Sequence, residues 1–138
     1  MSNQLFQNYD TAKIFGFGKR TEVASYVNDS YDTVTLAAGT LMGRIATTNK
    51  VVPLTSAAVD GSQIPLGFVL NTHSIEAGDT VDIALVVAGD VVEELITLQG
   101  SDTLNTVISG RTLRDRILGD TMGILLKSTD ELTGYDNA

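Results

Sequence analysis

Hydrophobic residues in this chain occur in short runs separated by polar turns, which is the pattern of a small β protein. Residues 40–46 and 51–55 are two apolar-rich runs, and the four polar residues between them give the spacing of a β-hairpin. Asp60-Gly61 predicts a second tight turn, because glycine adopts positive φ and an aspartate side chain can bond the backbone two residues on. The next predicted strand occupies 66–70.

Three further residues mark bends or close approaches around these strands. Gly39, which follows two alanines, is typical of a corner that leads into the first run. Pro65 lacks an N–H group, so its nitrogen must face away from any ladder partner. Gly67 interrupts an apolar strand, which predicts a β-bulge or the close approach of another backbone segment.

The best strand signal lies at 80–88, where apolar residues fall on both faces of the expected strand. We therefore predict that this strand is central and covered on both sides. Gly89-Asp90 is expected to reverse the chain into a strand at 91–98 with one solvent-exposed face. The two adjacent glutamates of that strand would point to opposite faces, which favours an acidic rim over a catalytic pair.

One short helix is predicted at 113–118. Thr112 is its expected N-cap, and Asp115 completes a variant of the capping box. Gly119 is expected to end the helix. So short a helix is not stable alone, so we expect its apolar residues, Leu118 included, to pack against the sheet.

The other predicted elements complete one domain, because 138 residues match the size of a single folded unit. They are strands at 23–27, 33–36 and 121–126, and a loop at 99–110 in which 103–108 can form one helical turn. We divide the chain into an N-terminal arm with the first strand (1–31), a β-rich body (32–127) and an acidic C-terminal tail (128–138).

Composition argues against several classes of protein. Hydrophobic residues make up 43% of the chain, but no run approaches the roughly 18 apolar residues of a membrane helix, so no membrane partner is expected. The first residues lack the basic and apolar regions of a secretory signal, so we expect synthesis in the cytoplasm. The absence of cysteine excludes disulfides and thiolate chemistry.

Charge is unevenly distributed along the chain. The formal net charge is −8 at pH 7, and residues 1–31 contribute none of it, so the body and tail carry the negative excess. Surfaces that follow a phosphate backbone need clustered lysine and arginine. Nucleic acid is therefore not an expected partner.

Aromatic residues are concentrated at the start of the chain, where six of the eight precede residue 32. Disordered tails are depleted of aromatic residues, and residues 1–18 show no helical or alternating periodicity. We interpret this segment as an extended arm that binds a partner outside its own domain. The predicted partner-binding residues are Leu5, Phe6, Tyr9, Ile14, Phe15 and Phe17. The alternative is that Phe15, Phe17 and their neighbours close the core of the same chain.

The chain lacks the residue patterns of common active sites. The single histidine, His73, lies in a predicted turn with no motif around it. Asp79 and Asp82 lack the alternating spacing of a calcium loop, and no dinucleotide fingerprint follows a strand. Gly16-Phe17-Gly18-Lys19 does not have the spacing of a phosphate loop. We expect no enzymatic activity, no cofactor and no metal.

Four segments in order resemble the head decoration proteins of tailed bacteriophages, of the lambda type. These segments are AGTLMGRI at 38–45, DGSQIPLGFVL at 60–70, VDIALVVAGDVVEELI at 81–96 and TLRDRILGDTMGILL at 112–126. They extend over about the last hundred residues, and their order carries the likeness more than any single piece.

The resemblance implies a mainly β fold, with a small β-clip or partly open barrel as its body and one or two short helices. It also implies a homotrimer at the local three-fold axes of the shell, where N-terminal arms add to an exposed strand of the major capsid protein. The protein would then stabilise the head from the outer capsid surface of the virion. The arm of this chain differs from that of one known family member, because it is rich in aromatic residues rather than in proline, alanine and glycine.

Two alternatives remain open at this point. Trimeric dUTP nucleotidohydrolases share the β-clip architecture, and Asp60-Gly61 would be their substrate-binding turn. The chain lacks their serine-containing phosphate motif, and its final TGYDNA is a poor substitute for their glycine-rich flap. The other alternative is a different accessory capsid subunit, such as a head-fibre base or a lattice cement protein.

Overall fold

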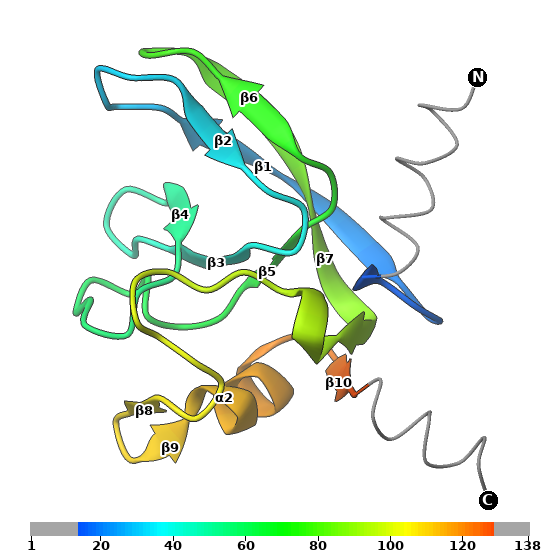
Figure 1. Ribbon diagram of the computed structural model, residues 1–138. Coiled ribbons are helices and arrows are strands. Elements are labelled where there is room, and N and C mark those ends of the chain that lie inside the picture. Colours follow the sequence, from blue (N-terminus) through cyan, green and yellow to red (C-terminus); the bar gives the residue numbers. More distant parts are fainter. Residues whose placement is uncertain (1–13, 129–138) are drawn as a thin grey trace, which may run out of the picture.

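The computed structural model of this chain describes residues 14–128 and is mainly β, which confirms the predicted fold class (Figure 1). The strands are β1 (Arg20–Val27), β2 (Val34–Leu36), β3 (Leu41–Arg44), β4 (Val51–Pro53), β5 (Gly67–Val69), β6 (His73–Ile75), β7 (Thr80–Val92), β8 (Val107–Ile108), β9 (Arg111–Thr112) and β10 (Ile124–Lys127). The helical elements are the 3-10 turn η1 (Glu93–Leu95) and the α-helix α2 (Leu113–Asp120).

The main sheet has the strand order β1-β7-β5-β3-β4, and β10 adds to the end of β7. Neighbouring strands along this order are antiparallel, whereas β10 is parallel to β7. The sheet curls until β1 lies near β4, but no ladder joins these two strands within the described chain. The sheet is therefore open and not a closed barrel. Figure 1 shows the β2–β6 pair at one end of the molecule and α2 with the β8–β9 pair at the other.

Strand β7 is central, as predicted, and it separates two hydrophobic cores. Val86 and Val91 belong to the first core, whereas Ile83, Leu85 and Val87 belong to the second. The burial of both faces explains why this strand reads as an almost continuous apolar run.

The prediction that Gly89-Asp90 reverses the chain is wrong. Strand β7 runs through both residues to Val92, because β10 pairs with 89–92 on one side and Phe15 forms a bridge with Val91 on the other. The chain then turns at η1 instead of forming the predicted strand at 91–98.

Local turn chemistry follows the prediction. Gly61 has φ of +103°, and the Asp60 Oδ1 atom accepts hydrogen bonds from the Ser62 amide at 3.0 Å and from its hydroxyl at 2.6 Å. Gly67 provides the predicted close approach, because a Cβ there would lie 2.7 Å from the Val86 carbonyl oxygen. Pro65 lies just outside the β5 ladder.

Two other predicted local features are confirmed. The corner at Gly39 has φ of +90°, and strands β3 and β4 form the predicted hairpin, with Arg44 opposite Val51.

Four smaller predictions need correction. His73 lies in β6 opposite Leu36 rather than in a turn, and 107–108 belongs to the β8–β9 pair rather than to a helical turn. Helix α2 continues past Gly119 to Asp120. Leu118 is 47% exposed, because Leu113 and Ile117, four residues apart, are the ones that face the core.

The interpretation of Ile14 and Phe15 as partner-binding residues is also corrected. Both side chains are buried in the first core of their own chain, where Phe15 is only 4% exposed. The physical reason is the extension of β7, since Phe15 covers one side of the added ladder at Val91. The alternative left open above is thus confirmed for these two residues. The other predicted arm residues, Leu5, Phe6 and Tyr9, lie outside the described residues.

Candidate functional site

Phe17 is the predicted arm residue that the described structure places in solvent, with 89% of its surface exposed. The backbone around it is held on both sides. The Gly16 amide donates to the Asp90 carbonyl at 2.8 Å, and the Asp90 amide donates to the Phe17 carbonyl at 3.0 Å. The backbone that carries this exposed ring is therefore fixed, and aromatic residues are enriched at protein interfaces.

Two more exposed apolar residues lie beside the end of β7. Leu125 of β10 pairs with Asp90, and Met122 precedes Gly123, whose carbonyl accepts from the Gly89 amide at 3.1 Å. We call Phe17, Asp90, Met122 and Leu125 the β7-end surface. Phe17 and Leu125 lie on opposite sides of the strand at Asp90.

The Asp90 carboxylate is the polar centre of the β7-end surface. Val91 points into the first core, so the neighbouring Asp90 points away from it. Within residues 14–128, no hydrogen bond or ion pair engages this carboxylate, and the residue is only partly exposed. A partner group that brings a positive charge would therefore find an uncompensated acid there.

Sequence reasoning missed Met122 and Leu125, because it assigned 121–126 to a single buried strand. Strand β10 begins only at Ile124, and alternate residues of a strand face opposite sides. Ile124 is buried and Leu125 is exposed. A partial signal was present in Gly123, which breaks the apolar run just before the strand.

The described chain enters and leaves the fold at the same place. Phe15 bridges Val91 from one side and Leu126 pairs with it from the other. Residues 1–13 and 129–138 therefore both connect to the body beside the end of β7. The predicted arm thus joins the body beside the β7-end surface.

Strand β1 forms one edge of the main sheet next to this surface. Within the described chain, the ladder partner of β1 is β7. The side chain of Val23 in β1 is exposed. Arg20 and Glu22 form an exposed ion pair at 3.3 Å on the same strand. Charged side chains are a common protection of free sheet edges, which otherwise pair with other chains.

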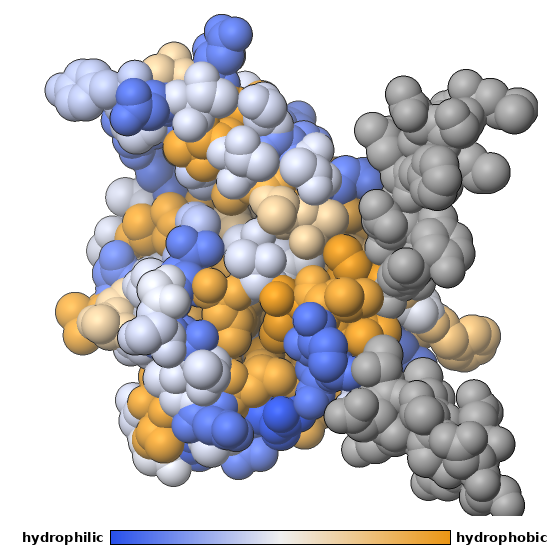
Figure 2. All heavy atoms as spheres, viewed as in Figure 1, coloured by the Kyte–Doolittle hydropathy of each residue, from blue (hydrophilic) through white to orange (hydrophobic). Residues whose placement is uncertain are grey.

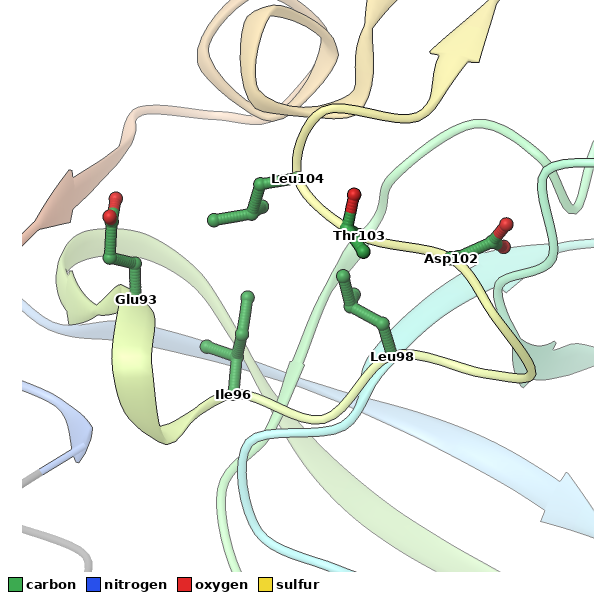
Figure 3. Close-up of a pocket in the computed structure, with 6 residues that line it drawn as sticks. All are labelled: Glu93, Ile96, Leu98, Asp102, Thr103 and Leu104. Carbon is green, nitrogen blue, oxygen red and sulfur yellow. The ribbon is translucent and has the colours of Figure 1, made fainter.

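A separate hollow of about 320 Å³ lies between η1 and the loop that leads to β8. Its lining residues are Glu93, Ile96, Leu98, Asp102, Thr103 and Leu104. Figure 3 shows the side chains of Ile96, Leu98 and Leu104 directed into a common space, with the two carboxylates at opposite ends. Figure 2 shows hydrophobic residues gathered on this face of the molecule.

Both carboxylates of the hollow have structural partners. Glu93 forms an ion pair with Arg114 of α2. The Asp102 carboxylate accepts a hydrogen bond from the Ser56 amide at 2.9 Å and another from its hydroxyl at 2.5 Å. These bonds fix the two ends of the hollow, so its apolar floor is preformed.

The Asp60 turn, which the enzymatic alternative needs as a substrate-binding element, has a local structural role. Hydrogen bonds from the Ser62 hydroxyl, and then from the Ser62 amide, lower the pKa of the Asp60 carboxyl below its ordinary value. Gly61 packs closely on the β3–β4 hairpin, since a Cβ there would lie 3.0 Å from the Arg44 carbonyl oxygen. The polar groups of this turn thus bond to one another.

Within residues 14–128, His, Asp and Glu side chains form no group of three that could hold a metal ion. No helix in that part of the chain combines the length and the hydropathy needed to cross a membrane. Comparison with models of protein families gives no match for this sequence, and comparison with curated proteins gives none.

Proposed function

We propose that this protein is a structural virion protein that binds the outer surface of a bacteriophage capsid and stabilises the head. The observation that carries the proposal is Phe17, an aromatic side chain that a fixed turn holds in solvent beside the point where the arm joins the body. The four segments that resemble head decoration proteins support the same function.

The attachment surface combines two parts that lie together. Phe17 is the anchor, and residues 1–13 join the body at the same place. The partner in this proposal is the major capsid protein. Its exposed strand would pair with the arm while Phe17 fills a pocket.

A homotrimer at the local three-fold axes fits this arrangement. Three identical arms would bind together, so modest contacts at each arm sum to tight attachment. The acidic body, which carries most of the net charge of −8, suits the solvent side of a shell that encloses DNA.

The test uses heads that lack this protein, from the phage that carries the gene. Phe17→Ala should lower the affinity for these heads roughly 30-fold per subunit, because removal of an interface hot spot costs about 2 kcal/mol or more. Cosedimentation at a series of protein concentrations measures the change. The exposed side chain contributes little to folding, so the unfolding midpoint should stay the same.

Tyr31→Ala is the matched control. Tyr31 is also an aromatic residue, with 100% exposure, but it follows β1 at the end opposite Phe17. The Tyr31→Ala variant should bind heads with the affinity of the unaltered protein. If the Phe17→Ala variant binds heads as tightly as the unaltered protein does, the proposed attachment surface is contradicted.

A further inference from the structure

We propose that the hollow beside η1 binds residues 1–13 of the same chain while the protein is free of the capsid, with Leu5 and Phe6 inserted between Ile96, Leu98 and Leu104. This docking is a property of the free protein and needs no capsid. Its consequence rests on the proposed function: the arm would have to leave the hollow before it pairs with the capsid.

The point where the chain enters the fold favours this occupant. A Cβ on Gly39 would lie 3.6 Å from the Ile14 Cδ1 atom and 3.5 Å from the Ile96 Cα atom. Ile14 and Ile96 therefore both lie next to Gly39. Since Ile96 lines the hollow, residues 1–13 join the body at a point near the hollow.

The segment is long enough to reach the hollow with slack. Phe6 lies eight residues before Ile14, and eight extended residues span roughly 26–29 Å. The short connection keeps the segment at an effective concentration on the order of millimolar. A weak contact between two apolar side chains and the hollow is therefore sufficient for docking.

The chemistry of the hollow matches the segment. Its volume of about 320 Å³ is at the lower end for ligand pockets and suits one or two large side chains. The three aliphatic residues of its floor pack on the first core and remain partly exposed. Covering them with Leu5 and Phe6 removes apolar surface of both partners from water.

Charge favours the N-terminal segment over the C-terminal one. Residues 14–128 carry eight basic and thirteen acidic residues, and two of the acids line the hollow. Residues 1–13 bring one basic residue, Lys13, against one acid, Asp10, and are therefore neutral. Residues 129–138 bring three further acids and no basic residue, so their approach to the net-acidic body would be repulsive.

The experiment places a spin label at the start of the full chain. The protein has no cysteine, so Ser2→Cys gives a single attachment site. Methyl-labelled protein should lose the signals of Ile96, Leu98 and Leu104 through paramagnetic relaxation. The signal of Val34, in β2 at the other end of the molecule, should remain. Uniform weak losses at all methyl groups would overturn the proposal.

Two variants of the labelled chain test the contact itself. Leu5→Ser with Phe6→Ser should restore the three methyl signals, whereas Gln4→Ser with Gln7→Ser, the matched polar control, should not. These changes lie outside residues 14–128, so they leave the side chains of the described core unaltered. Persistent signal loss in the Leu5 and Phe6 variant would contradict the proposal.

A mixing experiment distinguishes docking within one chain from docking between two copies. Spin-labelled protein without methyl enrichment is mixed with methyl-labelled protein that carries no spin label. The hollow signals should remain in the mixture. Their loss would show that a second copy occupies the hollow and would overturn docking within the chain. None of these measurements uses a capsid, so their failure leaves the proposed function open to its own test.

Discussion

Single side chains with local partners hold the turns of this fold, and Asp60 illustrates how. Its carboxylate accepts two hydrogen bonds from Ser62, and these bonds lower the pKa of the Asp60 carboxyl. The ionised form therefore stabilises the folded state at any pH above the pKa of the unfolded chain, which is about 3.9 for aspartate. This contribution is lost as the pH falls through the lower, folded-state pKa.

Asp60→Asn should consequently destabilise the protein at pH 7, and the difference from the unaltered protein should shrink as the pH falls below about 4. Urea unfolding at pH 7, 5 and 3 measures both proteins. Ser62→Ala is the control, because it removes the hydroxyl that contributes most to the shift, and it should weaken the dependence on pH. A constant difference across this range would show that the Asp60 hydrogen bonds do not couple to stability.

Phe15 and Phe17 show what a sequence can and cannot reveal at single positions. Both are phenylalanines next to Gly16, and no local feature tells the buried one from the exposed one. The difference depends on Val91, which bridges Phe15, and on the extension of β7. The Asp60 turn was predictable because both partners of its hydrogen bonds lie within two residues.

Helix α2 depends on its tertiary packing for most of its stability. Its start was predictable, since the Thr112 hydroxyl accepts a hydrogen bond from the Asp115 amide at 3.2 Å. Eight residues are too few for a stable isolated helix, so the buried side of α2 must hold it in place. Ile117 is fully buried there, and its neighbour Leu118 is exposed.

Ile117→Ala should lower the free energy of unfolding by about 2–5 kcal/mol, because it leaves a cavity in the first core. Leu118→Ala removes a side chain of the same size from the adjacent exposed position. It should change the free energy of unfolding by less than about 0.5 kcal/mol. Denaturant unfolding of both variants measures the contrast. Similar losses would mean that Leu118 has a packing role that the described residues do not account for.

Sheet elements were predictable where their pairing is local. Strands β3 and β4 are joined by a short polar loop, so spacing alone identified the hairpin. The length of β7 was not predictable, because its last residues pair with β10, which begins 35 positions after Gly89. Partners so distant in sequence leave no periodic signal near residue 89. The candidate site could not be predicted for the same reason, since only the pairing of β10 with β7 brings Met122 and Leu125 to the strand end beside Phe17.

The complete fold is organised around β7, which divides the two cores and connects both ends of the described chain. The first core contains Ile14 and Phe15 together with residues from α2 and β10. The first and last described segments therefore close one core from two sides. This arrangement makes Ile14 and Phe15 part of the body, so the body begins no later than Ile14.

Two truncations test this boundary. Deletion of residues 2–13 should leave the free energy of unfolding within about 1 kcal/mol of that of the full chain, because these residues contribute at most the weak docking proposed above. Deletion of residues 2–18 should lower it by at least about 3 kcal/mol, since it removes the buried Phe15 side chain and the backbone hydrogen bonds to Asp90. Denaturant unfolding compares the two proteins with the full chain. If both truncated proteins are as stable as the full chain, Phe15 is not buried and belongs to the arm. If both are destabilised to the same extent, residues 2–13 are part of the folded body.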